Sequence, residues 1–249
     1  MQVYLAGVTS AKEFLLEDDF SFAKRLYMLE SFCYFSDWEY EILPFVKGFL
    51  LDSGAFTFMA GKHISLKNLN NYVDKYCDFI NLNKIEHFFE MDVDCIYGYD
   101  TVKKIRSYIE RKTNKQCIPV WHKSRGKDDF IGMCKDYNYV SIGGIVTKEI
   151  VRSEWRFFPW FIDKAHENNA KIHALGFSFH PELIQKCPFD SVDATYWNYG
   201  NRWGYIDVIS LNGKHQKIKQ AGKRLKRKEA LRHNFIEWIK YSEWCESFK

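Results

Sequence analysis

The chain has 249 residues and a mass of 29.7 kDa, enough for one large domain or two small ones with a substantial core. Hydrophobic residues make up 46% of the sequence and charged residues 27%, and these near-average values exclude a disordered or fibrous protein. Aromatic residues are unusually frequent at 18%, so we expect some rings to line a binding surface.

Charge is unevenly distributed along the chain. Between Lys214 and Arg232 there are nine Lys or Arg residues and one Glu, whereas the remainder carries 27 basic and 31 acidic residues. Such a basic segment suits a polyanion, because neutralising phosphates releases condensed counterions. A solvated helix face is an equally weighted interpretation.

No targeting or membrane signal is found in the sequence. Residues 1–14 contain no basic stretch followed by an apolar run, and no run of about 18 apolar residues occurs anywhere. We therefore expect a soluble protein of the cytoplasm, or of the host cytoplasm if a phage encodes it, with no membrane partner. The seven cysteines are widely spaced, so neither a disulfide framework nor a zinc site is predicted.

Predicted strands and helices alternate along the chain. The β-rich runs are Val3–Gly7, Gly48–Asp52, His87–Asp92, Cys117–Trp121, Tyr139–Ile142, Lys171–Leu175, Asp190–Ala194 and Tyr205–Ile209. Helical apolar spacing occurs in Phe14–Cys33, Leu66–Ile80, Tyr99–Lys112, Asp128–Tyr137, Glu149–Asn168 and Pro181–Lys186.

This alternation predicts an α/β fold with parallel strands, either a (βα)8 barrel or a doubly wound open sheet. No GxGxxG or GxxxxGK[ST] motif follows a strand, which favours the barrel. We expect a TIM-like barrel over residues 1–213 and a basic helical segment over 214–249, packed on the barrel or extending from it.

Polar residues and glycines close most of the predicted strands. In a barrel the active site lies at the C-terminal ends of the strands, so these residues are expected to converge. Singly, each has a structural explanation: an Asp can cap a helix, His122 can pack in the core beside Trp121, and glycines can form a tight turn. The candidates for a shared site are Asp52, Asp92, Asp94, His122, Gly143, Gly144, Gly176, Phe177 and Asp193.

Five short motifs resemble those of the tRNA-guanine transglycosylase family, in the family's order. The run 51–56 (LDSGAF) resembles its DSGGF motif, and 139–145 (YVSIGGI) resembles its strand ending in GGL. Met91-Asp92 is similar to the substrate-aspartate strand, 174–176 (ALG) to the MGVG strand end, and 189–193 (FDSVD) to the strand of the nucleophilic aspartate. The resemblance implies a (βα)8 barrel that exchanges guanine in nucleic acid for a 7-deazaguanine.

The departures from that family favour DNA over tRNA as the polymer. The chain is shorter than the tRNA enzymes and lacks their CxCxxC…H zinc ligands, so no zinc subdomain is expected. The run 191–197 (SVDATYW) is similar to a (V)DSTSW stretch of a shorter, DNA-modifying branch, from which Ala194 and Tyr196 depart. The implied partners are DNA, or alternatively tRNA, and a free base such as 7-cyano-7-deazaguanine.

The chemistry of base exchange assigns roles to the candidates. The reaction passes through an oxocarbenium-like state that a carboxylate can capture at C1′, and Asp193 is the candidate nucleophile. Asp52 is the candidate acid and base for the leaving and incoming bases. Asp92, with Asp94 in reserve, suits the donor edge of guanine. The N–H groups around Gly144 and Ile145 suit O6. His122 can also donate to O6 or the 7-substituent, with Trp121 as the competing residue.

Base flipping requires an aromatic platform, and phosphate binding requires basic residues. Phe56, Phe177 and Tyr196 are candidate platforms, with core packing at least as good an explanation for each. No cofactor or metal is expected. The candidate phosphate contacts are Lys123, Arg125, Lys223, Arg224, Lys226, Arg227 and Lys228.

Two other protein classes fit parts of this pattern. A non-catalytic barrel could bind nucleic acid through the basic segment alone. A metal-dependent barrel hydrolase could use Asp52, Asp92, Asp94 and His122 as ligands.

Overall fold

Parallel strands form one curled sheet in the computed structural model, which describes residues 1–59, 65–177, 186–200, 204–210, 214–219 and 226–247. Within these residues the sheet has seven strands in the order β3-β2-β1-β7-β6-β5-β4. Their bounds are β1 Gln2–Ala6, β2 Tyr27–Ser31, β3 Gly48–Asp52, β4 Val120–Trp121, β5 Tyr139–Ile142, β6 Lys171–Ala174 and β7 Ser191–Ala194. All pairs in this sheet are parallel, so the C-terminal ends of the strands meet at one rim.

The segment 87–90 connects the two edges of this sheet. It forms isolated parallel bridges from Phe88 to Leu51 in β3, and from Phe89 to Ile118 just before β4. Four backbone hydrogen bonds of 2.8–3.0 Å accompany the bridges. The curl of the sheet therefore brings β3 and β4 close enough for one short segment to pair with both.

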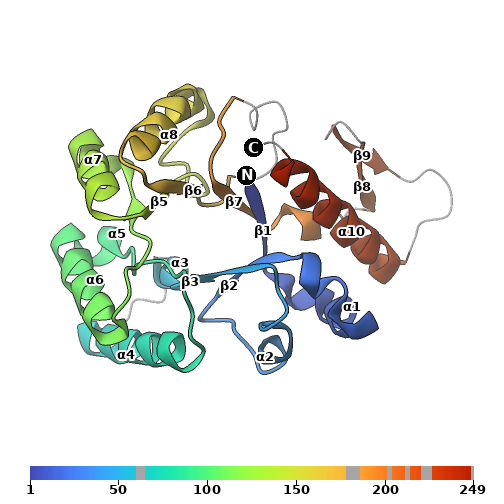
Figure 1. The fold of residues 1–249 in the computed structure, drawn as a ribbon, viewed down its shortest axis with the longest axis horizontal. Coiled ribbons are helices and arrows are strands. Elements are labelled where there is room, and N and C mark those ends of the chain that lie inside the picture. The colour runs from blue at the N-terminus through green and yellow to red at the C-terminus, as the bar shows by residue number, and fades with distance from the viewer. Residues whose placement is uncertain (60–64, 178–185, 201–203, 211–213, 220–225, 248–249) are drawn as a thin grey trace.

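Helices surround the strands on the outside of the curl (Figure 1). The longer ones have an apolar face towards the sheet, as the amphipathic spacing predicts, and polar residues towards solvent. The α-helices are α1 Lys12–Leu16, α2 Glu39–Ile42, α3 Ala55–Met59, α4 Leu66–Leu82, α5 Asp94–Tyr97, α6 Tyr99–Thr113, α7 Gly126–Asp136, α8 Phe158–Glu167 and α10 Arg227–Glu246. Short 3-10 turns are η1 Val8–Ala11, η2 Asp18–Phe20, η3 Ala23–Arg25, η4 Lys123–Arg125, η5 Arg152–Phe157 and η6 Tyr196–Asn198.

Residues alternate between the two faces of the sheet along each strand. In β6 the odd-numbered His173 belongs to the inner side, while Ile172 and Ala174 pack in the outer core under the helices. The inner face is a separate buried cluster of Tyr4, Ala6, Tyr27, Leu29, Leu50, Phe89, Ile118 and Val120. A side chain at the last inward position of a strand is consequently delivered to the space enclosed at the rim.

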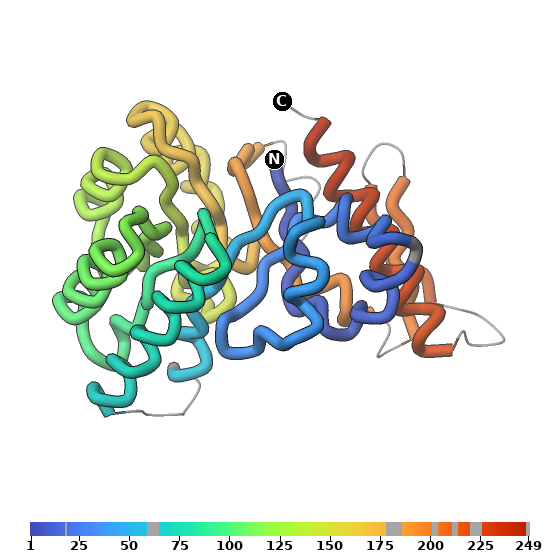
Figure 2. Tube along the Cα trace, turned by 60° about the horizontal axis from the view of Figure 1, so that its bottom comes forward, coloured from blue at the N-terminus to red at the C-terminus, as the bar shows by residue number. Residues whose placement is uncertain are grey.

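The C-terminal segment packs against the N-terminal strand. The Ser242 hydroxyl on α10 donates to the Val3 carbonyl at 3.0 Å, and the Met1 amine donates to the Cys245 carbonyl at 3.3 Å. Figure 2 shows both chain ends on the same side of the molecule, with α10 beside the N-terminal strand. α10 therefore covers β1 as one of the surrounding helices and does not project into solvent.

A hairpin of β8 Tyr205–Ile209 and β9 His215–Lys219 precedes α10. The pairing is antiparallel and spans the expected domain boundary between residues 213 and 214. β8 also packs on α10, where the Asp207 carboxylate accepts a 3.1 Å hydrogen bond from the Trp238 indole. Tyr205–Ile209 is a strand, as predicted, but it lies outside the parallel sheet.

Most of the other predicted elements agree with the structure, but the predicted strand His87–Asp92 forms only two isolated bridges, and one predicted helix is wrong. The strands at Gly48–Asp52 and Tyr139–Ile142 have the predicted bounds, and α4, α6, α7 and α8 lie in the predicted helical segments. The predicted helix Phe14–Cys33 is wrong, because β2 occupies its second half. β2 is buried on both faces, so its apolar run lacks the alternation that distinguishes a strand from a helix. The predicted helix Pro181–Lys186 falls mostly outside the described residues.

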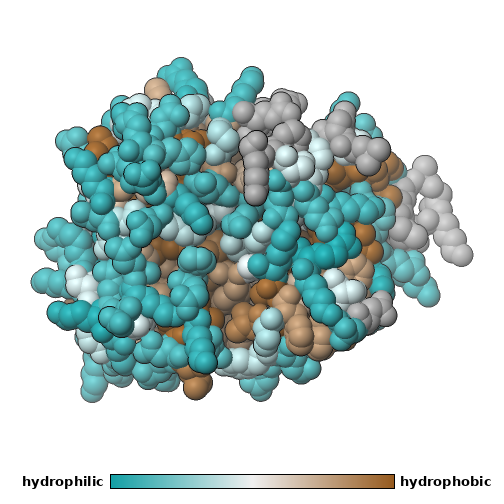
Figure 3. Space-filling view, viewed as in Figure 1, coloured by the Kyte–Doolittle hydropathy of each residue, from teal (hydrophilic) through white to brown (hydrophobic). Residues whose placement is uncertain are grey.

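The surface matches the charged composition of the chain. The face drawn in Figure 3 is mostly hydrophilic, with small groups of apolar side chains between polar ones. In the described part of the chain, no helix combines the length and the apolar character needed to span a bilayer.

Candidate active site

A cavity of about 770 Å³ opens at the rim where the strands end. We call it the central cavity. Residues at the end of each strand or directly after it contribute to its wall, because parallel pairing gathers all the C-terminal ends. Of the residues predicted from sequence, it is lined by Asp52, Phe56, Asp92, His122, Gly143, Gly144, Ile145, Gly176 and Asp193.

Asp193 is held in a fixed orientation at the end of β7. Its Oδ1 accepts hydrogen bonds from the Gly176 N–H at 2.6 Å and from His173 Nε2 at 3.3 Å. Only 7% of the residue is exposed, and no donor among the described residues reaches Oδ2. One oxygen is therefore anchored while the other is left for a reacting atom.

His173 is a functional residue that the sequence reasoning missed. It is fully buried, and its Nδ1 lies 2.6 Å from the Ser191 hydroxyl, which also bonds the Tyr139 hydroxyl. The Tyr139, Ser191 and His173 groups thus form a hydrogen-bonded chain that ends on Asp193. The signal was present in the sequence, since His173 is a polar residue at an inward position of a predicted strand.

Asp52 ends β3 and has an environment unlike that of Asp193. Its Oδ2 accepts a 3.0 Å hydrogen bond from the Gly54 N–H. Burial raises the pKa of Asp52 to about 6, with a further increase from the nearby charges of Asp92 and Asp193. A carboxyl group with this pKa can both give and accept a proton near neutral pH.

Asp92 is held by His122, which is itself held by Glu149. The His122 ring nitrogens lie 3.1 Å from Asp92 Oδ2 and 3.0 Å from Glu149 Oε2. Burial alone would lower the pKa of His122, but its hydrogen bonds to the two carboxylates raise it to about 9. The ring is therefore an imidazolium at neutral pH and positions Asp92. Because both nitrogens are used, His122 cannot supply the predicted hydrogen bond to guanine O6.

Gly143 and Gly144 each have a steric reason to be glycine. A Cβ on Gly143 would come within 2.9 Å of His122 Cε1, and one on Gly144 within 2.9 Å of Glu149 Oε2. Gly144 also has a φ of +81°, which side chains rarely adopt. The N–H groups of Gly144 and Ile145 make no hydrogen bond to another described residue, so they remain donors for a ligand at this wall.

The predicted aromatic platforms differ in exposure. Phe56 lines the central cavity and is 54% exposed, as a platform requires. Phe177 is not a platform, because it is buried among Trp155, Phe158 and Phe189 behind the strand end. Tyr196 does not line the cavity; its hydroxyl bonds the Lys217 amine.

Asp94 and Arg125 bind each other instead of a ligand. Two Arg125 nitrogens donate to the two Asp94 oxygens at 2.8 and 2.7 Å, and a third donates to Glu90 at 3.1 Å. The Arg125 side chain is only 1% exposed and stacks on Tyr99, with its guanidinium carbon 4.1 Å from the ring centre. Asp94 is therefore no substitute for Asp92, and Arg125 is not available to phosphates.

Some of the basic residues that were predicted to contact phosphates form ion pairs within the protein instead. Lys123 pairs with Glu154 at 2.6 Å and Lys228 pairs with Glu13, whereas Lys226 and Arg227 are exposed at the start of α10. The remaining two, Lys223 and Arg224, lie outside the described residues.

A buried carboxyl pair was also missed from the sequence. Glu30 lies at the end of β2, lines the central cavity, and packs near Glu39 of α2. Burial and the charge of Glu39 raise the pKa of Glu30 above its ordinary value. The pair was missed because β2 itself was predicted to be helical.

The four residues considered as metal ligands do not form one group. Asp94 is turned to Arg125, and both His122 nitrogens bind carboxylates. Among the described residues, no cluster of three or more His, Cys, Asp or Glu side chains has an arrangement suited to a metal ion.

Comparison of the chain with models of known protein families and with curated protein sequences finds no match.

Proposed function

We propose that the protein is a base-exchange transglycosylase that replaces guanine in nucleic acid with a 7-deazaguanine. The observation that carries the proposal is the pair of unlike carboxyl groups facing one cavity. Asp193 is anchored through one oxygen, and Asp52 has a pKa of about 6. β3 and β7 are separated by β2 and β1 in the curled sheet, and the curl brings both carboxyl groups to the wall of the same cavity.

In the first half of the proposed reaction, Asp193 Oδ2 bonds to C1′ as the C1′–N9 bond of the nucleotide breaks. The electron pair of that bond passes to guanine, which takes a proton from Asp52. In the second half, N9 of the incoming base attacks C1′ and gives its proton to Asp52, and the bond to Asp193 breaks. The polymer backbone stays intact, and no redox or group-carrying cofactor takes part.

Base recognition uses the part of the cavity wall that follows segment 87–90, β4 and β5. The Asp92 carboxylate, held by His122, accepts from N1–H and the exocyclic amine of guanine or a 7-deazaguanine. The N–H groups of Gly144 and Ile145 donate to O6, which glycine allows because the backbone can approach closely. The exposed ring of Phe56 supports the flipped base.

The proposal includes a finer description of the fold and the partners. We propose a complete (βα)8 barrel, with the segment 87–90 as the strand between β3 and β4, supported by its two parallel bridges. The motif resemblance supports DNA as the polymer, tRNA as the alternative, and a base such as 7-cyano-7-deazaguanine as the second substrate. The protein is expected to act in the cytoplasm.

One experiment tests this proposal directly. The chain is expressed in cells that make 7-cyano-7-deazaguanine, and DNA and tRNA are separately hydrolysed and analysed by mass spectrometry. We expect a deazaguanine nucleoside in DNA, and its absence when the Asp193→Asn variant is expressed. A nucleoside found only in tRNA would select the alternative polymer. Its absence from both, with the protein folded and expressed, would contradict base exchange.

A further inference from the structure

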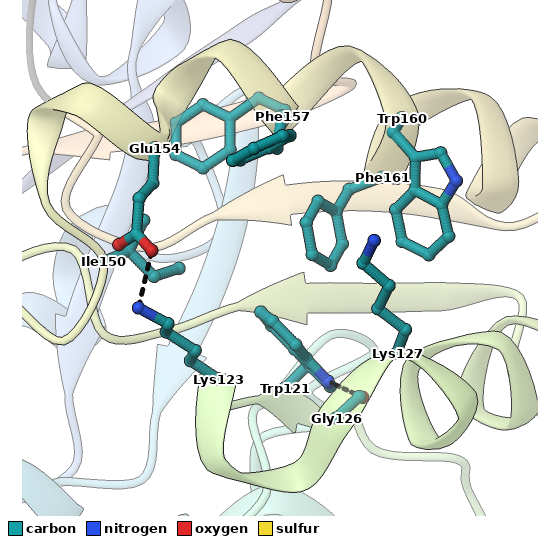
Figure 4. A pocket seen from close by; sticks show the side chains of 10 residues that line it. Trp121, Lys123, Gly126, Lys127, Ile150, Glu154, Phe157, Trp160 and Phe161 are labelled. Carbon is teal, nitrogen blue, oxygen red and sulfur yellow. Dashed lines mark hydrogen bonds and ion pairs between the residues drawn. The ribbon is translucent and has the colours of Figure 1, made fainter.

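A second pocket, of about 230 Å³, lies just outside the central cavity, between the beginnings of α7 and α8. We call it the aromatic pocket. Figure 4 shows its rings and the lysines that border it. It is lined by Trp121, Lys123, Gly126, Lys127, Ile150, Glu154, Phe157, Phe158, Trp160 and Phe161.

The two pockets meet at the C-terminal end of β4. Trp121 and His122 are consecutive, so their side chains point to opposite sides: His122 into the central cavity and Trp121 into the aromatic pocket. The connection from β5 to α8, residues 143–157, borders both pockets as well. Its first part, 143–147, lines the central cavity, whereas Ile150, Glu154 and Phe157 line the aromatic pocket.

The rings of the aromatic pocket are held in place by their neighbours. The Trp121 indole N–H donates to the Gly126 carbonyl at 2.7 Å, and its ring centre lies 4.7 Å from that of Phe161. Trp160 packs edge-on against Phe161 at 4.9 Å. Phe157 at the border is 48% exposed, and the Arg156 guanidinium carbon lies 4.9 Å from its ring centre. Rigid rings of this kind stack planar groups with little loss of side-chain entropy.

The charge around the aromatic pocket is opposite to that of the central cavity. The Lys127 amine lies 5.0 Å from the Trp160 ring centre, and Lys123 forms an ion pair with Glu154. Exposed Arg152 and Arg156 follow on the same connection. The central cavity instead has the carboxyl groups of Asp52, Asp92 and Asp193. A ligand that spans both pockets therefore has an uncharged, donor-rich part in the central cavity. At the aromatic pocket it has an aromatic group with negative charge nearby.

We propose that the aromatic pocket binds a nucleobase that neighbours the target guanosine in the same polynucleotide, with the adjoining phosphates near Lys127 and Arg156. The proposal rests on the proposed function, which places the target base in the central cavity. The aromatic pocket is small enough to select one planar ring system. A nucleic-acid strand that crosses residues 143–157 reaches both pockets. The proposal implies that base exchange depends on the identity or the stacking of one base that flanks the target guanine.

The test measures binding, which separates it from catalysis. The probe is a single-stranded oligodeoxythymidylate with one guanine and with 2-aminopurine placed in turn at each position beside it. We expect one flanking position to lose fluorescence on binding, because 2-aminopurine is quenched when stacked. The Phe157→Ala variant should abolish that quenching and weaken binding about 5- to 150-fold, the range for loss of a base–aromatic stack. Lys127→Ala should weaken binding without restoring the fluorescence.

Matched controls lie on the same elements or on exposed apolar positions elsewhere. Lys135→Ala removes an exposed lysine from the last turn of α7, and Leu82→Ala removes a side chain that is 80% exposed at the end of α4. Neither should change the quenching. An abasic nucleotide at the responsive position should weaken binding to the wild-type protein but not to Phe157→Ala, since the stack is already lost.

The outcomes distinguish the two proposals. Binding and exchange with no position that responds to Phe157→Ala would overturn the flanking-base pocket and leave base exchange standing. Failure of the wild-type protein to bind the guanine-containing oligonucleotide or the corresponding tRNA loop would overturn both.

Discussion

The central cavity and the basic C-terminal segment both stood out in the sequence, but the structure treats them differently. The carboxyl groups of the cavity are far apart in the chain, from Asp52 to Asp193, and converge at one rim. The basic segment is contiguous in sequence, yet the structure divides it between the β8–β9 hairpin and α10. Arg232 pairs with Glu17 at 2.8 Å and Lys228 pairs with Glu13, so part of the positive charge attaches α10 to α1.

This difference shows that closeness in the sequence does not by itself bring side chains together in the folded protein. A helix distributes consecutive residues around its axis, so a run of lysines and arginines is dispersed and partly neutralised. Parallel strands do the reverse, because their ends meet regardless of chain separation. We therefore expect substitutions in the cavity to have much larger effects on exchange than substitutions in the basic segment, and the following experiments test that order.

The largest effect is expected for Asp193→Asn. The amide cannot form the covalent bond to C1′, so exchange should fall by at least about 10³-fold, while polymer binding survives. Exchange of labelled guanine into the polymer measures the first quantity, and fluorescence anisotropy measures the second. Asp190→Asn, directly before the same strand, is the matched control, because that carboxylate binds His166 and the Ile172 N–H and does not line the cavity. Undiminished exchange by Asp193→Asn would move the nucleophile elsewhere.

Asp52→Asn should be nearly as damaging to exchange but should stabilise the fold. Loss of the acid and base should reduce the rate by about 10² to 10⁴. The folded pKa of about 6 exceeds the ordinary 3.8, so wild-type stability falls as pH rises through that interval. At pH 8 the variant should therefore gain about 1 to 3 kcal/mol in free energy of unfolding, measured by denaturation.

The same pKa gives a pH profile for the wild-type protein. Release of guanine requires protonated Asp52, so its rate should decline above a pH of about 6. A rate loss below threefold in Asp52→Asn, or a profile with no such decline, would leave Asp52 as a turn residue only.

His122→Gln should have an intermediate effect, confined to base binding. Without the imidazolium, Asp92 loses a charged hydrogen bond, and the KM for the free base should rise about 10-fold with a smaller change in kcat. The His122 pKa of about 9 lies above the ordinary 6.5, so the ion pairs are complete below pH 6.5 and are lost as pH rises through 9. Wild-type KM should thus increase above pH 9, and the variant should lack this transition. Equal changes in KM for base and polymer would argue for a purely structural role.

The smallest effect is expected when Lys226 and Arg227 are both changed to Glu. Both are exposed at the start of α10, so the melting temperature should be unchanged. If they contact phosphates, polymer affinity should fall and the log–log salt slope should shrink by about 0.7 to 0.9 per contact. Arg232→Ala, which removes an ion pair with Glu17, should leave the slope unchanged and cost less than about 1 kcal/mol of stability. An unchanged slope in the double variant would place the polyanion contacts at Lys127, Arg152 and Arg156 beside the aromatic pocket.

Much of the central cavity was predictable because its residues carry a local signal. Asp52, Asp92 and Asp193 each follow a β-rich run, and chain order alone predicts that such strand ends meet. The choice between Trp121 and His122 was not predictable, since it depends on which face of β4 is turned inwards. Both residues line a pocket, and only the curvature of the sheet decides which pocket each one enters.

The sequence by itself determined that strands and helices alternate and that acidic residues and glycines close the strands. Tertiary structure alone decided the partners: His173 behind Asp193, Glu149 behind His122, and Arg125 with Asp94. It also decided that β2 is a strand, because burial on both faces removes the alternation that would reveal it. The physical reason is common to all of these cases. Hydrogen bonds between side chains of different strands depend on register and curl, which no single segment of the chain encodes.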